Sequence, residues 1–69
     1  MPNDEAVVVR SVASLREAEA YLARLWIIAV RNQIDPPRIY TVDVAREVTL
    51  TLLFRDFRRW LECAGDHLG

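Results

Sequence analysis

Between residues 41 and 54 most of the apolar side chains fall on even positions, and most of the polar side chains fall on odd ones. The apolar set is Val42, Val44, Val48, Leu50, Leu52 and Phe54. A period of two is typical of a β-strand with one buried face, and this run is too long for a single strand. The pattern predicts a β-hairpin with a three-residue loop, 45–47, that pairs Val42 with Leu50 and Tyr40 with Leu52. Because this loop has no glycine or asparagine, a five-residue loop over 43–47 is the alternative.

The segment before the hairpin predicts a strand followed by a long helix. Residues 6–10 read Ala-Val-Val-Val-Arg, and consecutive β-branched residues favour a strand. Because valines lie on both sides of this strand, we expect both of its faces to be covered. Ser14 and Glu17 have the spacing of a capping box, which predicts that a helix begins here and runs to about Asn32.

The apolar face of this predicted helix broadens toward its end. The apolar residues at helical spacing are Leu15, Ala18, Leu22, Leu25, Trp26 and Ala29. In the last two turns Ile27, Ile28 and Val30 lie on the flanks, so the apolar face is wider than packing against one sheet requires. Either the following loop or a second subunit covers this excess, and we favour the second subunit.

Pro36 and Pro37 end the first helix, and a second helix follows the hairpin. Asp56 is expected to be the N-cap of the second helix, and Gly65 is expected to end it as the C′ residue. The apolar face of the second helix comprises Phe57, Trp60, Leu61 and Ala64. Tyr21, on the first helix, is expected at the rim of the core, as is Tyr40.

The order strand, helix, strand, strand, helix predicts a small α+β domain. A right-handed crossover through the first helix places the strands in the order 1-3-2, with both helices on one face of a three-stranded sheet. This arrangement resembles a ferredoxin-like fold that lacks its last strand, a likeness of architecture that implies no function. We expect the domain to span 6–65, between a disordered tail at 1–5 and a frayed C-terminus at 66–69.

The size of the chain bears on its assembly. A chain of 69 residues with 52% hydrophobic residues and a net charge of −1 is too apolar to be disordered, yet buries only about 60% of its unfolded surface. With one cysteine, an intrachain disulfide is excluded, so association is the remaining way to gain stability. We therefore expect a homodimer. The expected interface residues are Val7, Val8, Val9, Trp26, Ile27, Ile28 and Val30.

Charge and hydropathy also bear on location and source. The first five residues are polar and acidic, unlike a secretion signal, and the longest apolar run, 25–30, is too short to cross a bilayer. These features favour a cytoplasmic protein. Every basic residue is an arginine, which suggests a bacterial or phage source with a G+C-rich genome.

Few residues offer chemistry. Cys63 and His67 are spaced to share one side of a helix, but two ligands do not complete a metal site, and Gly65 lies between them. No catalytic, cofactor-binding or metal-binding residue is therefore predicted, and no small-molecule ligand.

The leading interpretation is a non-catalytic protein-interaction or regulatory module that acts as a homodimer, with a further protein partner of unknown identity. The alternative is a nucleic-acid-binding or acidic-partner surface built from Arg55, Arg58 and Arg59.

Overall fold

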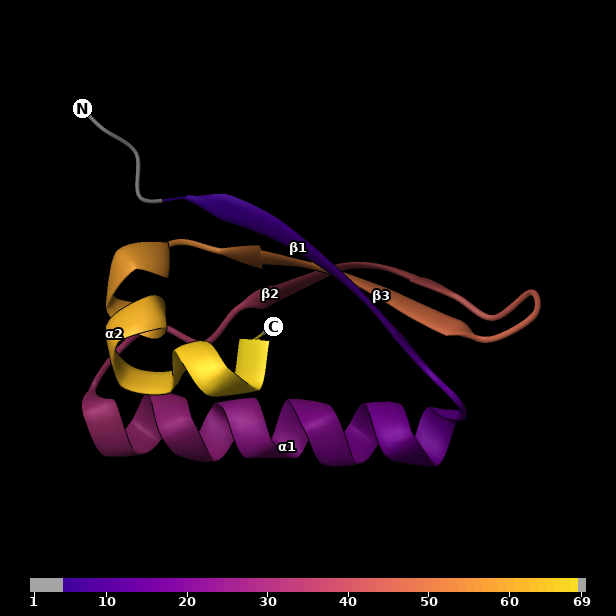
Figure 1. Ribbon diagram of the computed structural model, residues 1–69, viewed down its shortest axis with the longest axis horizontal. Helices are drawn as coiled ribbons and strands as arrows, with labels where there is room; N and C mark the ends of the chain where they lie inside the picture. Colours follow the sequence, from indigo (N-terminus) through magenta and orange to yellow (C-terminus); the bar gives the residue numbers. More distant parts are fainter. Residues whose placement is uncertain (1–4, 69) are drawn as a thin grey trace.

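The computed structural model describes residues 5–68, which form a three-stranded sheet with two helices on one side of it (Figure 1). The elements are β1 (Ala6–Val12), α1 (Leu15–Asn32), β2 (Arg38–Asp43), β3 (Val48–Phe54) and α2 (Phe57–Leu68). The strand order is β1-β3-β2, and both pairings are antiparallel. The predicted α+β domain, including its strand order, is confirmed. Of the expected N-terminal tail, residues 1–4 lie outside the described residues, and Glu5 is exposed.

β3 is the central strand, and its even-numbered residues face the helices. Val48, Leu50, Leu52 and Phe54 are buried, as the alternation predicts, whereas Val42 and Val44 of the same predicted set are exposed. Val42 pairs with Leu50 as expected. The expected pairing of Tyr40 with Leu52 is wrong, because a β-bulge makes Tyr40 an extra residue and brings Ile39 opposite Leu52. Four residues, 44–47, connect the strands.

β1 buries one face only within the single chain. Val12 is buried and Val8 half-buried on the side of the helices, whereas Val7 and Val9 lie exposed on the opposite face. The expectation that both faces are covered therefore does not hold within one chain. β1 pairs with β3 over its whole length, from Ala6 opposite Phe54 to Val12 opposite Val48. Because β1 is at the end of the strand order, no strand within residues 5–68 pairs with its other side, which we call the free edge of β1.

Caps hold α1 at both ends. The Ser14 hydroxyl accepts a hydrogen bond from the Glu17 N–H at 3.1 Å, and the Glu17 carboxylate accepts one from the Ala13 N–H at 2.6 Å. The helix ends at Gln33, which has a left-handed backbone with φ of 56°. The N–H of Ile34 reaches back to the Ala29 carbonyl at 3.0 Å, which forms the Schellman arrangement of a helix C-terminus.

The core lies between β3 and the two helices. On α1 the buried residues are Ala18, Tyr21, Leu25 and Ala29. The buried stripe is thus rotated toward Tyr21, so Leu15 and Trp26 are exposed and not part of the core, contrary to the spacing-based expectation. Trp60 from α2 is fully buried, and its ring meets the Phe54 ring edge-on at a centroid distance of 5.2 Å.

The end of α2 differs from the sequence-based expectation. The helix breaks at Ala64, with φ of −150°, and Gly65 does not adopt the positive φ of a C′ glycine. The chain then resumes a helical turn to Leu68, which is buried. Residues 66–68, where fraying was expected, are therefore helical, and the Leu68 side chain packs into the core, whereas residue 69 lies outside the described residues. Asp56 does mark the start of α2, since its carbonyl accepts from the Trp60 N–H at 3.1 Å.

Candidate functional site

The face of the sheet that points away from the helices is uncovered and partly apolar. Val7 and Val9 from β1 are 59% and 63% exposed, and Tyr40 from β2 is 72% exposed. Val7, Tyr40 and Leu53 line a common hollow on this face. Toward the other end of β1 the face becomes polar, where the hydroxyls of Ser11 and Thr49 lie 3.4 Å apart. We call the exposed side chains of Val7, Val9 and Tyr40, together with the half-buried Leu53, the open-face patch.

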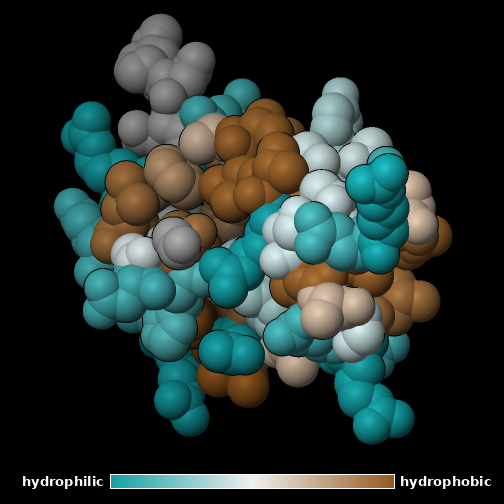
Figure 2. Space-filling view, turned by 45° about the vertical axis from the view of Figure 1, so that its right-hand side comes forward, coloured by the Kyte–Doolittle hydropathy of each residue, from teal (hydrophilic) through white to brown (hydrophobic). Residues whose placement is uncertain are grey.

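A second apolar surface lies on α1. Trp26, Ile27 and Val30 are exposed and line a shallow groove together with Arg31. We call Trp26, Ile27 and Val30 the α1 patch. On the side of the molecule that Figure 2 presents, hydrophilic residues separate the hydrophobic areas, so the apolar surface in view is divided into patches.

The seven expected interface residues therefore divide into two groups. Five are exposed in the single chain, in the open-face patch and the α1 patch: Val7, Val9, Trp26, Ile27 and Val30. The other two, Val8 and Ile28, are half-buried and pack against the core. Their apolar character is explained by that packing and needs no partner.

The arginines of the alternative surface have different surroundings. The Arg59 guanidinium donates a hydrogen bond to the Asn32 carbonyl at 3.0 Å, at the C-terminus of α1. This carbonyl end carries partial negative charge, so Arg59 ties α2 to α1. Arg55 lines a polar hollow with Asp35, Pro36 and Arg38, and Arg58 is exposed. The neighbouring Trp60 ring donates through Nε1 to the Asp35 carbonyl at 2.9 Å and belongs to the core.

Cys63 and His67 do not share a helical face, because the break at Ala64 lies between them. Cys63 is exposed, whereas His67 lines a hollow that Cys63 does not border. Among residues 5–68, no three His, Cys, Asp or Glu side chains gather closely enough to hold a metal ion. The two residues that the sequence singled out therefore do not form a joint site.

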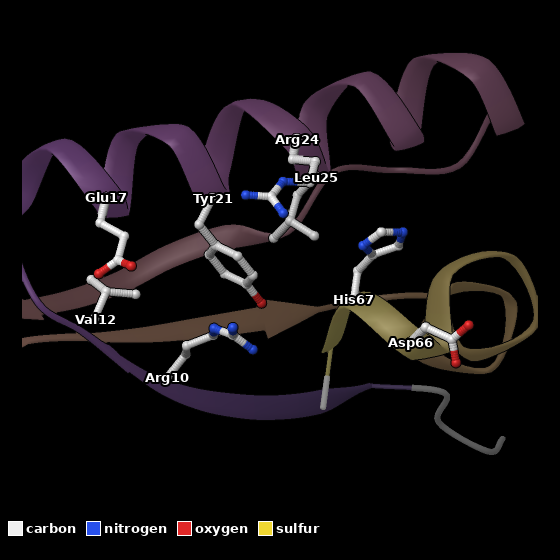
Figure 3. Close-up of a pocket in the computed structure, with 8 residues that line it drawn as sticks. All are labelled: Arg10, Val12, Glu17, Tyr21, Arg24, Leu25, Asp66 and His67. Atoms are coloured by element: carbon white, nitrogen blue, oxygen red, sulfur yellow. The ribbon is translucent and has the colours of Figure 1, made fainter.

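The hollow beside His67 contains a group of polar residues that sequence reasoning did not single out. It has a volume of about 220 Å³ and lies between β1, α1 and the end of α2 (Figure 3). We call it the Arg10 hollow. Its lining residues are Arg10, Val12, Glu17, Tyr21, Arg24, Leu25, Asp66 and His67. These positions are scattered in the sequence, so no spacing pattern points to them.

Arg10 and Tyr21 form the inner wall of this hollow. The guanidinium carbon of Arg10 lies 4.6 Å from the centre of the Tyr21 ring, a cation–π distance. Tyr21 is only 5% exposed, so it lies deeper than the rim position expected for it. Burial raises the pKa of the Tyr21 phenol, and the charges of Arg10 and Arg24 partly offset that rise. The phenol is therefore a neutral hydrogen-bond donor at neutral pH.

No protein-family model, curated protein or solved structure matches this chain. Neither helix in residues 5–68 has the length and apolar content that crossing a membrane requires.

Proposed function

We propose that this chain is a small non-catalytic protein-interaction module that acts as a homodimer in the cytoplasm. The observation that carries the proposal is the free edge of β1, next to the exposed Val7 and Val9. An unpaired edge strand offers a row of backbone N–H and C=O groups to a second strand. The exposed and unpaired Cys63 fits a reducing compartment.

The geometry of β1 supports antiparallel pairing of two copies about a two-fold axis. A register centred on Val9 places Val9 opposite its own copy and Val7 opposite Ser11 of the partner, which uses the whole strand. Residues opposite each other then lie on the same face, so one sheet continues through both molecules with all helices on one side. The valines of the open-face patch meet at the junction.

The α1 patch is the competing dimer surface. It is apolar and exposed but is a single narrow stretch of one helix, whereas the β1 edge adds backbone hydrogen bonds to side-chain contacts. Once the dimer forms through β1, the α1 patch stays free to bind a further protein partner. Of the two surfaces, β1 is therefore the better site for self-association.

The nucleic-acid alternative has less support. One of its three arginines, Arg59, is engaged by the Asn32 carbonyl. The chain as a whole carries a net charge of −1, whereas phosphate binding depends on excess positive charge.

Light scattering coupled to size-exclusion chromatography tests the dimer. We expect a particle of twice the chain mass of 8.0 kDa at micromolar concentration. Val9→Lys places two like charges opposite each other at the centre of the junction and should give a folded monomer. Val44→Lys, at an equally exposed valine in the hairpin loop, is the matched control and should remain a dimer.

Two outcomes would overturn the proposal or its geometry. A folded wild-type monomer at about 100 µM contradicts the homodimer, since a specific association of this kind is expected at micromolar affinity. If Ile27→Lys dissociates the dimer and Val9→Lys does not, the subunits meet through the α1 patch and the β1 arrangement is wrong.

A further inference from the structure

We propose that the Arg10 hollow binds a compact oxyanion, the phosphate or carboxylate group of a small ligand. Two guanidinium groups from different elements, Arg10 on β1 and Arg24 on α1, line the same hollow. Arginine presents several N–H donors in a planar fork that matches the oxygens of phosphate and carboxylate. Tyr21 and His67 add a phenol and an imidazole to the same lining.

Two buried polar atoms in this wall have no partner in the part of the chain that the structure describes. The Tyr21 hydroxyl and the Arg10 Nε are both buried without a hydrogen-bond partner among the described residues. Such atoms are rare in folded proteins, because each has lost its hydrogen bonds to water and gained none in exchange. Tyr21 is more than nine-tenths buried and lines the hollow, so its hydroxyl is a donor held ready at the site. An oxyanion supplies acceptors for both groups.

Within residues 5–68, the two carboxylates that line the hollow, Glu17 and Asp66, form no ion pair with its arginines. The Glu17 carboxylate accepts a hydrogen bond from the Ala13 N–H, and this contact holds the carboxylate at the start of α1. Asp66 points away from the Tyr21 hydroxyl (Figure 3). Within residues 5–68 neither Arg10 nor Arg24 forms an ion pair with a carboxylate.

The size of the hollow limits the ligand. Its volume of about 220 Å³ is below the roughly 300–1,000 Å³ of pockets that enclose drug-sized molecules. A single phosphate or carboxylate group suits this space, with the rest of a larger ligand extending outward. Phosphate carries more charge than a carboxylate, so it should bind more tightly between two guanidinium groups.

Titration of the full chain with inorganic phosphate, followed by heteronuclear NMR at constant ionic strength, tests the proposal. We expect saturable shifts that include Arg10, Tyr21, Arg24 and His67. A parallel titration with acetate separates the two sources of oxyanion and should show weaker binding. Arg24→Gln should weaken phosphate binding at least tenfold, and Tyr21→Phe should weaken it several-fold.

Arg31→Gln is the matched control, because Arg31 is an exposed arginine of the same helix and lies outside the hollow. It should bind phosphate like the wild type. The proposal is wrong if the wild type shows no saturable shift up to 50 mM phosphate. A dissociation constant of roughly that size is the weakest that we would regard as a binding site. The proposal is equally wrong if Arg31→Gln loses as much affinity as Arg24→Gln, since diffuse positive charge then explains the binding.

The titration repeated with Val9→Lys separates this site from the dimer. The Val9 side chain lies on the open face of the sheet and does not line the hollow. Phosphate binding should therefore survive in that variant whether or not the chain dimerises.

Discussion

The ring and the hydroxyl of Tyr21 need separate explanations. The ring packs in the core and under the Arg10 guanidinium, which explains why an aromatic residue occupies this position. The hydroxyl is not needed for that packing, because it makes no hydrogen bond to the described residues. A phenylalanine would fill the same space, so the hydroxyl calls for an explanation of its own.

The pKa of Tyr21 leads to a pH-dependent stability. Burial raises this pKa above its ordinary value of 10.0, so the folded chain holds the phenolic proton more tightly than the unfolded chain does. The resulting stability is present below pH 10 and is lost as the pH rises through the folded-state pKa. We expect the free energy of unfolding, measured by chemical denaturation from pH 8 to 11, to fall less steeply in Tyr21→Phe than in the wild type.

Tyr40→Phe is the control for this experiment, because Tyr40 is exposed. Its stability should fall with pH as in the wild type. At pH 7, without added anion, Tyr21→Phe should be as stable as the wild type or more stable by up to about 1 kcal/mol, since it removes an unpartnered buried hydroxyl. If Tyr21→Phe instead lowers the free energy of unfolding at pH 7 by about 2 kcal/mol or more, the hydroxyl has a hydrogen-bond partner in the folded chain. A loss of that size is roughly the cost of leaving such a partner unsatisfied.

At the scale of elements, the ends of α1 are held by different means. The start uses the capping box of Ser14 and Glu17, which the sequence predicts. The end uses Gln33 in a left-handed conformation, which glycine adopts without strain and residues with a Cβ atom do not. Nothing in the sequence near Gln33 marks this conformation.

Gln33→Gly should therefore stabilise the fold by about 0.5–1 kcal/mol, because it relieves the left-handed strain and retains the backbone hydrogen bonds. The free energy of unfolding in urea measures the effect. Ala20→Gly, at an exposed position within α1, should instead destabilise by about 1 kcal/mol, the ordinary cost of a helical glycine. Equal losses in both variants would show that Gln33 carries no strain.

The elements that the sequence predicted correctly are those with local signals. Alternation identified the hairpin, and the capping box identified the start of α1. The bulge at Tyr40 and the rotation of the α1 face toward Tyr21 depend on how the elements pack, so local spacing did not reveal them. The Arg10 hollow was even less predictable from the sequence, because its lining residues on β1, α1 and α2 come together only in the folded chain.

At the scale of the whole molecule, one small core supports the entire fold. Among residues 5–68, thirteen buried hydrophobic residues form a single cluster, and both the open-face patch and the α1 patch lie outside it. These two patches are the exposed apolar surfaces that a dimer or a further partner would cover. Association through them adds stability to a chain whose own core is limited by its length.

The place of β1 in the sheet has a consequence for the order of folding. β2 and β3 are neighbours in sequence and form a hairpin, whereas β1 reaches β3 only after α1 and β2 have been traversed. Closing the longer loop costs more chain entropy, so β1 should join the sheet last and leave it first. In the monomeric Val9→Lys variant, amide hydrogens of β1 should exchange with solvent faster than those of β3, as read by NMR.

Equal protection of β1 and β3 would instead show that the sheet opens only as a unit. If β1 does open first, β3 loses a partner while β2 and the helices hold their places. The site left on β3 accepts the β1 strand of any copy of this chain. Exchange of β1 strands between molecules is domain swapping. We therefore expect warming at high concentration to produce long-lived domain-swapped oligomers of this protein.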